Sequence, residues 1–326
     1  MTTINNMPLC ITLGDPLGIG PEITARTLDF LQKKKINITF IVIGSKKAFH
    51  KACENLNINK KFTYIKEFID YNEKFEFLNR PTIVGGSISY KSICKAAELY
   101  KKKMVKAIVT APISKESLHL AGHKFDGHTG LLGSLFNIEE PYLMLANKIF
   151  STLHVTCHKP LKEAIKLITK EKIVEIINIG YKHMLKVKKI EPRIAVCGLN
   201  PHAGENGEFG DEEIYINKLV KSLKSKKMNI TGTVSADSML LNNKNYDCYV
   251  FMYHDQALIP FKYISKFSGV NYTGNLDVIR VSPDHGTAYS LKGTKDISYD
   301  SLKKCFILIN KINKNKIKHN ESKKIS

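Results

Sequence analysis

Short apolar runs rich in β-branched residues alternate with helical patterns along most of the 326-residue chain. Each run precedes a loop and then a segment whose apolar residues recur every three or four positions, the spacing of a helix with one buried face. Strands that alternate with helices favour an α/β protein with a mostly parallel sheet. The predicted strands are residues 9–13, 38–43, 81–84, 105–110, 142–146, 151–156, 193–198, 247–252 and 278–281. The predicted helices include residues 21–31, 87–102, 161–167, 170–187, 212–225 and 301–311.

The length and the composition exclude several classes of protein. The chain is long enough for one large domain or two of ordinary size. No apolar run approaches the roughly 18 residues that a membrane-spanning helix needs, and the first residues lack the pattern of a signal peptide. The seven cysteines include no CxxC pair, which argues against a zinc ribbon or a disulfide framework and favours a cytoplasmic protein.

The net charge of +20 raises the question of a nucleic-acid partner. Of the 50 basic residues only four are arginine, the residue that most often reads bases and clamps phosphates. No basic stretch is interleaved with aromatic residues on which bases could stack. We therefore interpret the lysines as solvated surface residues and expect neither a nucleic-acid nor a membrane partner.

Three histidines follow three predicted strands. His158 ends the segment STLHVTCH, His202 follows RIAVCGLNP, and His254 follows CYVFMY. In an open α/β sheet ligands bind outside the carboxyl ends of the strands, so the three imidazoles would converge if these strands are neighbours. Three neutral imidazoles with an open fourth position suit a catalytic zinc, cobalt or manganese ion. A histidine at a strand end is also a common hydrogen-bonded loop residue, and the sequence leaves both interpretations open.

The residues around these histidines add further candidates. Asp255 and Gln256 directly follow His254 and could orient its ring. Lys262 comes after an apolar Leu-Ile-Pro-Phe segment, where a lysine can bind an anion or act as an acid or base, although an ordinary surface lysine is the more frequent case. His154 lies inside its predicted strand, and we expect it to be a buried structural residue.

Two segments precede predicted helices and contain residues that could contact an anion. GDPLGIGPE (residues 14–22) lacks both GxGxxG and GK[ST], so we interpret it as a tight turn rather than as a nucleotide-binding loop. His128 and Thr129 stand at a predicted helix N-terminus. An anion-binding site and a plain N-cap are equally consistent with that position.

The segment from residue 270 to residue 288 contains Asn271, Arg280 and the turn Asp-His-Gly-Thr at residues 284–287. The planar guanidinium of Arg280 matches a phosphate or carboxylate with two parallel hydrogen bonds. A structural ion pair with one of the 30 acidic residues is the alternative, and the sequence does not separate the two.

Taken together, these segments resemble 4-hydroxythreonine-4-phosphate dehydrogenase of pyridoxal 5′-phosphate (vitamin B6) biosynthesis. The matching segments occur in the family's order from Gly14 to Ala288, and they are specific as a set. The chain departs from the family at Gly130, where a glutamate is expected, and at Ser114, where a histidine is frequent. The segments are GDPLGIGPEI, TAPISK with AGHKFDGHT, TCHKPL, GLNPHAGENGEFGDEE, the Ala-Asp of SADSML, YHDQALIPFK, and GVN with IRVSPDHGTA.

The resemblance implies roles for individual residues. The family's divalent metal, which would be zinc, magnesium, cobalt or manganese, maps onto His158, His202 and His254. Lys262 is the candidate catalytic residue. The implied substrate-binding residues are His128, Thr129, Asp237, Lys262, Asn271 and Arg280. The residues implied to lie near the NAD or NADP cofactor are His285, Gly286 and Thr287.

The resemblance also implies two α/β/α domains with a cleft between them, as in the isocitrate and isopropylmalate dehydrogenases. By that analogy the first domain comprises residues 1–126 and 270–326, and the second comprises residues 127–269 with the three histidines. The expected assembly is a homodimer with its active site at the subunit interface and one histidine ligand contributed by the partner.

The implied activity is NAD(P)- and metal-dependent oxidation of a small phosphorylated amino acid, 4-phosphohydroxy-L-threonine. The product, 2-amino-3-oxo-4-phosphooxybutanoate, decarboxylates to 3-amino-2-oxopropyl phosphate. One alternative is a related dehydrogenase of a 4-phospho-threonate or 4-phospho-erythronate. A remote alternative is a non-catalytic basic protein that binds nucleic acid.

Overall fold

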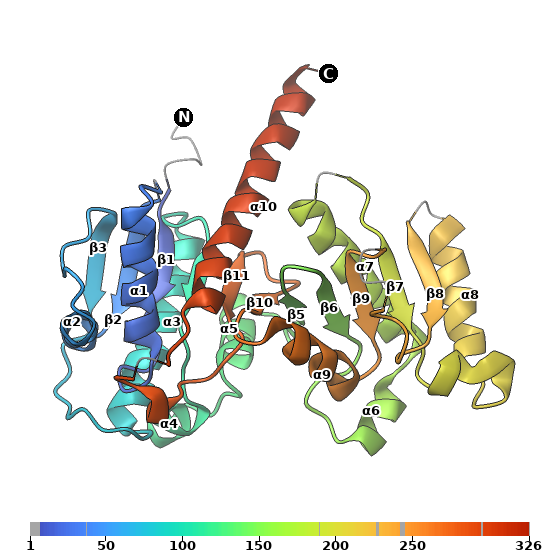
Figure 1. Ribbon diagram of the computed structural model, residues 1–326, viewed down its shortest axis with the longest axis horizontal. Helices are drawn as coiled ribbons and strands as arrows, with labels where there is room; N and C mark the ends of the chain where they lie inside the picture. The colour runs from blue at the N-terminus through green and yellow to red at the C-terminus, as the bar shows by residue number, and fades with distance from the viewer. Residues whose placement is uncertain are drawn as a thin grey trace. The chain divides into compact units, whose positions relative to one another are not determined.

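A computed structural model describes residues 7–325 except 37, 189, 226–227, 242–244 and 295. The chain has an α/β fold and divides into two compact units (Figure 1). The first unit comprises Met1–Pro141 and Val270–Ile309, and the second comprises Tyr142–Gly269 and Asn310–Ser326. None of the described helices is both long and apolar enough to cross a membrane.

The strands of the first unit form the order β3-β2-β1-β4-β11-β10, in which only β10 is antiparallel to its neighbour β11. These strands are β1 (Leu9–Thr12), β2 (Phe40–Gly44), β3 (Ile65–Asp70), β4 (Ile108–Thr110), β10 (Val270–Thr273) and β11 (Arg280–Pro283). The helices that begin in this unit are α1 (Gly20–Lys33), α2 (Lys46–Asn55), α3 (Ile83–Lys101), α4 (Lys115–Leu120), α5 (His128–Phe136) and α10 (Asp300–Ile325).

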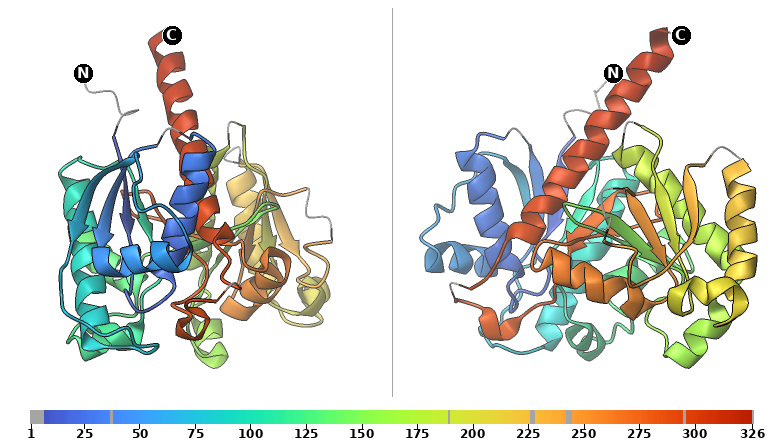
Figure 2. Two further views of the ribbon diagram at one scale, coloured as in Figure 1. Left: turned by 60° about the vertical axis from the view of Figure 1, so that its left-hand side comes forward. Right: turned by 45° about the vertical axis from the view of Figure 1, so that its right-hand side comes forward.

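The side chains of β1 and its neighbours alternate between two faces, and helices cover both. Cys10 and Ile108 pack in one apolar cluster with Ile93 of α3. On the opposite face the ring of Phe40 meets Phe306 of α10 at a centroid distance of 5.4 Å. Since successive residues of a strand point to opposite faces, this alternation explains the three-layer arrangement of the unit, with α1 and α3 on opposite sides of the strands (Figure 2).

The second unit repeats the arrangement with the strand order β5-β6-β9-β7-β8, in which only β5 is antiparallel to its neighbour β6. Tyr249 and Phe251 of β9 pack against Phe261 of α9, whereas Cys248 of the same strand faces Gly180 of α7. The strands are β5 (Leu143–Ala146), β6 (Ser151–His154), β7 (Ile194–Cys197), β8 (Ile230–Val234) and β9 (Cys248–Phe251). The helices are α6 (Leu161–Leu167), α7 (Lys170–Val187), α8 (Glu212–Ser225) and α9 (His254–Ser265).

The structure differs from the sequence-based expectation at several places. Residues 81–84 form no strand, because Thr82 is the N-cap of α3 and its hydroxyl accepts a hydrogen bond from the Gly85 N–H at 3.0 Å. Strand β3 was not predicted, since its side chains are all half-buried or exposed. The first unit runs to Pro141 rather than ending at residue 126, because Leu131 and Leu132 of α5 are buried in the same cluster as Ile93. Its second segment ends at Ile309, so that residues 310–326, which were expected in the first domain, group with the second unit.

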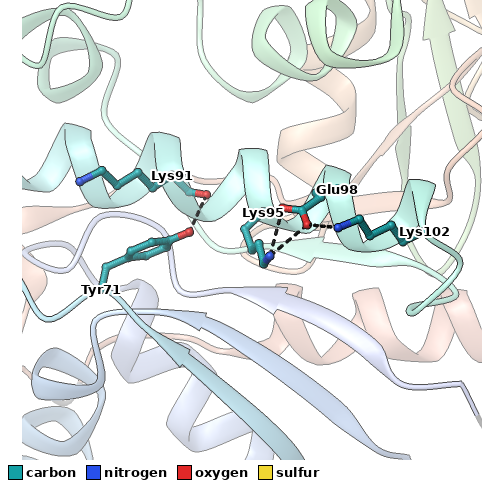
Figure 3. Close-up of polar contacts among 5 residues, drawn as sticks. All are labelled: Tyr71, Lys91, Lys95, Glu98 and Lys102. Atoms are coloured by element: carbon teal, nitrogen blue, oxygen red, sulfur yellow. Dashed lines mark hydrogen bonds and ion pairs between the residues drawn. The ribbon is translucent and has the colours of Figure 1, made fainter.

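The lysine-rich surface of α3 shows how part of the positive charge is accommodated. Lys95 and Lys102 both donate to the carboxylate of Glu98, at 3.0 and 2.7 Å, on the outer face of the helix (Figure 3). These hydrogen bonds lower the pKa of Glu98, and the one from Lys102 has the larger effect. Such exposed pairs contribute little to stability, because solvent and salt screen the charges. The lysines of α3 therefore behave as solvated surface residues.

Candidate functional site

The three histidine-bearing strand ends lie side by side. Strand β9 pairs in parallel with both β6 and β7, so the carboxyl ends of the three strands meet at one edge of the second unit. His158 lies a few residues beyond β6, His254 is the first residue of α9, and His202 lies in the 3₁₀ turn η2 (Pro201–Gly207) beyond β7. The adjacency that the sequence argument required is therefore present.

His158 and His254 form a close pair. Their ring centroids are 5.3 Å apart with an angle of 45° between the ring planes. Two imidazoles that bind one ion through nitrogens about 2.0–2.1 Å from it have centroids about 5 Å apart. The Nδ1 atom of His254 lies 2.6 Å from a carboxylate oxygen of Asp255, which leaves Nε2 as the nitrogen for a ligand. A carboxylate on the second ring nitrogen is the usual arrangement for metal-binding histidines.

His202 has the same kind of partner but lies apart from the pair. Its Nδ1 is 2.6 Å from a carboxylate oxygen of Glu205. Within the part of the chain that the structure describes, no three His, Cys, Asp or Glu side chains gather into a set able to hold a metal ion. The donor types and their carboxylate partners fit a divalent metal, but this chain alone brings only two of the three predicted ligands together.

His154 lies closer to this edge than its position inside β6 suggested. The residue is buried as expected, yet its ring centroid is 6.1 Å from that of His254. Burial, as the largest cause, and the neighbouring His254 and His158 lower the pKa of His154 to about 3. The ring is therefore neutral at physiological pH. The sequence alone did not reveal this proximity, because it depends on the pairing of β6 with β9, the strand that precedes His254.

The remaining candidates of the second unit are exposed. The hydroxyl of Ser235 donates to the Asp237 carboxylate and, with the nearby His202, lowers the pKa of Asp237. This electrostatic interaction places Asp237 in the neighbourhood of one candidate ligand. Lys262 is exposed in the last turn of α9, two turns after His254.

In the first unit, Arg280 is buried without a carboxylate partner among the described residues. The residue is 2% exposed. Its Nε and one terminal nitrogen donate to the Thr110 hydroxyl at 3.2 and 2.7 Å, and the other terminal nitrogen donates to the Thr273 hydroxyl at 2.9 Å. Burial lowers the pKa of Arg280 to about 10, so the group remains charged at neutral pH. A buried cation held only by hydroxyls suits an anionic ligand better than a structural ion pair.

The other predicted substrate residues of this unit leave polar atoms available. Burial and the charge of Arg280 hold the pKa of His128 well below its usual value, so its ring is neutral. Among the described residues, neither Nε2 of His128 nor Oδ1 of Asn271 has a hydrogen-bond partner, although both atoms are buried. His128 and Thr129 are the first two residues of α5, whose N-terminal N–H groups also favour an anion.

The predicted cofactor turn is braced by the GDPLGIGPE segment. The Ile19 N–H donates to the Thr287 carbonyl at 2.9 Å, and a Cβ atom on Gly18 would lie 2.9 Å from the Thr287 side chain. The Tyr289 hydroxyl donates to the buried Asp15 carboxylate at 2.8 Å. Around Gly286, no described atom beyond the glycine itself and its two chain neighbours lies within 4 Å of the position that a Cβ would take. The segment thus acts as a tight turn, as the sequence indicated, and the sequence did not reveal that it supports residues 285–289.

Comparisons with known proteins agree with the expected family. A family model described as pyridoxal phosphate biosynthetic protein PdxA matches residues 35–309. A 4-hydroxythreonine-4-phosphate dehydrogenase of Geobacter metallireducens is 37% identical over 318 residues, which cover 92% of this chain and 94% of that protein. A D-threonate 4-phosphate dehydrogenase of Pectobacterium atrosepticum is 34% identical over 316 residues, which cover 90% of this chain and 95% of that protein.

Solved structures give the same result. A crystal structure of 4-hydroxythreonine-4-phosphate dehydrogenase from Klebsiella pneumoniae matches with a TM-score of 0.80 at 30% identity, over 94% of this chain and 98% of that chain. An isocitrate dehydrogenase from Methylococcus capsulatus matches at 11% identity with a TM-score of 0.50, over 95% of this chain and 88% of that chain, and shares the fold alone. The chain therefore belongs to the PdxA family of pyridoxal phosphate biosynthetic proteins and is an oxidoreductase of the dehydrogenase class.

Proposed function

We propose that this protein oxidises 4-phosphohydroxy-L-threonine at its C3 hydroxyl, with a divalent metal ion and NAD or NADP. The product is 2-amino-3-oxo-4-phosphooxybutanoate, which loses CO₂ to give 3-amino-2-oxopropyl phosphate for pyridoxal 5′-phosphate synthesis. The observation that carries the proposal is the alignment of the ends of β6, β9 and β7, which bear His158, His254 and His202. Relatives named for this activity support the substrate.

The residues of each unit have separate tasks in this proposal. His158, His202 and His254 would hold the metal through ring nitrogens, with Glu205 and Asp255 fixing two of the rings. A bound divalent ion would lower the pKa of an oxygen ligand, since it lowers that of water from about 16 to about 7. In this proposal the three rings and the two carboxylates would hold in place the ion that favours deprotonation of the substrate hydroxyl.

The first unit supplies the groups that bind the substrate's anionic end. Arg280 would donate to phosphate or carboxylate oxygens through the N–H groups that the threonines leave over. His128 is neutral and its Nε2 atom is buried, so this nitrogen can exchange a hydrogen bond with a ligand without adding charge. Thr129, Asn271 and Asp237 are assigned to the remaining polar groups of the substrate. Lys262 is assigned to proton transfer or anion binding.

The turn that contains His285, Gly286 and Thr287 is assigned to the dinucleotide. Its support by Ile19 and Gly18 keeps the turn in place, and the open space around Gly286 allows close approach of a ligand to the backbone. An independent binding measurement with NAD and NADP tests this assignment.

A second candidate substrate is D-threonate 4-phosphate. Relatives named for that activity are 33–34% identical over 90% of this chain, close to the values for the first group. The two substrates differ at C2, which bears an amine in one and a hydroxyl in the other, so the same metal and phosphate contacts serve both.

The decisive experiment measures formation of reduced nicotinamide with each substrate in turn, with and without a metal chelator. Turnover of 4-phosphohydroxy-L-threonine that is faster than turnover of D-threonate 4-phosphate, and is lost with chelator, is the expected result. Preference for the threonate would assign the second activity. Turnover that persists in metal-free protein would refute the role of the three histidines.

We also propose that the protein is a homodimer in which the partner completes the metal site. Ile259, Tyr263 and Phe267 lie four residues apart along α9 and the loop after it, and their exposed fractions are 69%, 85% and 70%. Exposed apolar residues in such a row are typical of a protein interface. Sedimentation equilibrium would give the mass of a dimer, and Tyr263→Glu should shift it toward the monomer. A monomeric wild-type protein would contradict the proposal.

A further inference from the structure

The side chain of Gln256 connects two of the histidine-bearing strand ends. Its Oε1 accepts a hydrogen bond from the Met252 N–H at 2.8 Å, and its Nε2 donates to the Gly198 carbonyl at 3.0 Å. Met252 follows β9 and stands two residues before His254, whereas Gly198 follows β7 and stands four residues before His202. One amide group therefore spans the two chain segments that lead to these histidines.

The third strand end is tied to the same point. The backbone N–H and the hydroxyl of Thr156 both donate to the Met252 carbonyl, at 3.1 and 3.0 Å. Thr156 stands two residues before His158, and both Thr156 and Met252 are buried. The Met252 carbonyl thus accepts from the segment that leads to His158. The Met252 N–H donates to Gln256, the residue that also bonds to the segment leading to His202.

Glu213 of α8 secures the segment on the far side of Gly198. This carboxylate is 3% exposed and accepts from the Leu199 N–H at 2.7 Å, the Asn200 N–H at 2.8 Å and the Asn200 side-chain amide at 3.0 Å. The loop that follows is strained, because all five residues from His202 to Asn206 have φ between 37° and 77°. Such a run persists only where the surrounding contacts impose it.

We propose that Gln256, with Glu213, is a positioning residue that holds in place the backbone segments presenting this chain's candidate metal ligands. Neither side chain is assigned to the cation itself. Gln256 keeps the ends of β7 and β9 at a constant separation, and Glu213 holds the start of the strained loop that presents His202. The inference rests on the proposed function, because the role is defined toward the cation that the histidines would bind.

The test uses the full-length protein, stripped of metal with a chelator and titrated with Co²⁺ alone. The visible absorption of histidine-bound Co²⁺ reports its coordination geometry, and competition with a chelator gives the affinity. Gln256→Leu keeps a similar volume but removes both hydrogen bonds, so we expect Co²⁺ binding to weaken about 10- to 100-fold with an altered spectrum. Glu213→Leu should have an effect of the same kind.

A matched control lies in the same unit. The side-chain amide of Asn217 likewise bridges a helix and a strand, donating to the Thr233 hydroxyl at 3.0 Å and accepting from the Thr233 N–H at 2.9 Å. Strand β8, which contains Thr233, leads to none of the three histidines, so Asn217→Leu should leave the Co²⁺ spectrum unchanged. An equal change in Co²⁺ binding in Asn217→Leu and Gln256→Leu would indicate a general loss of fold rather than a loss of positioning, and would overturn the inference.

Two further variants separate the possible failures. Gln256→Glu retains an acceptor for the Met252 N–H but loses the donor to Gly198, so it should weaken Co²⁺ binding even if Gln256→Leu does not fold. His202→Ala must lose Co²⁺ affinity if the proposed function is right. Loss in His202→Ala with wild-type binding and spectrum in folded Gln256 variants would refute this inference alone. Wild-type binding in His202→Ala would refute the proposed metal site.

Discussion

Replacement of Arg280 by methionine should affect function far more than stability. Burial lowers the pKa of this guanidinium to about 10. Compared with the usual value of about 12.5, this corresponds to roughly 3 kcal/mol by which the buried charge disfavours folding, at about 1.4 kcal/mol per pKa unit. Because folding lowers the pKa, the penalty is fully present below pH 10 and is relieved as the pH rises above that value.

The hydrogen bonds of Arg280 offset this penalty. Arg280→Met leaves the hydroxyls of Thr110 and Thr273 without their donor, at about 1 kcal/mol each, and a small loss of packing adds to that. The gain and the losses nearly cancel, so we expect the free energy of unfolding to stay within about 2 kcal/mol of wild type. Chemical denaturation followed by circular dichroism measures this change.

The functional effect is expected to be large. Three of the guanidinium's five N–H groups donate to threonine, which leaves two for a phosphate or carboxylate. Loss of two hydrogen bonds between charged partners, at about 1.5–3 kcal/mol each, should lower kcat/KM about 10²- to 10⁴-fold. Arg193→Met is the matched control, because Arg193 pairs with Asp247 at 3.4 Å in the second unit and should retain kcat/KM.

The opposite pattern would refute this reasoning. If Arg280→Met lost more than about 4 kcal/mol of stability, the residue would behave as one member of a buried ion pair. Retention of wild-type kcat/KM would remove Arg280 from substrate binding.

Three other changes test separate parts of the site. His202→Ala should abolish activity and lower the metal content measured by atomic absorption, with an unchanged circular dichroism spectrum; wild-type activity in metal-free mutant protein would exclude the residue. Gly18→Ala should raise the KM for NAD(P) more than the KM for the phosphorylated substrate, because its Cβ would lie 2.9 Å from Thr287, and equal KM changes would argue against the cofactor turn. Burial alone would raise the pKa of Asp247, but hydrogen bonds from Arg193 and Lys188 hold it below its usual value. Its contribution to stability is therefore present above about pH 4 and is lost as the pH falls through its folded-state pKa. Asp247→Asn should flatten the acid limb of the stability curve, and an unchanged limb would show that other carboxylates dominate it.

The sequence determined the secondary structure wherever apolar residues recur at a regular helical spacing. Helices α6, α7 and α8 have the predicted bounds, because apolar residues recur along them at helical spacing and Thr169 caps α7. The sequence failed at Thr82, where a short apolar stretch is equally compatible with a strand and a helix start. It also placed His158, His202 and His254 after strands, since that requires only local pattern.

Only the tertiary structure decided which strands are neighbours. Strand β9 pairs with β6, which lies nearly a hundred residues away in the sequence, and with β7, which lies about fifty residues away, and no local preference specifies that order. The same holds for the bridge from Gln256 to Gly198, the approach of His154 to His254, and the absence of a carboxylate beside Arg280 among the described residues. Each depends on distances between parts of the chain that the sequence leaves independent, and packing alone sets those distances.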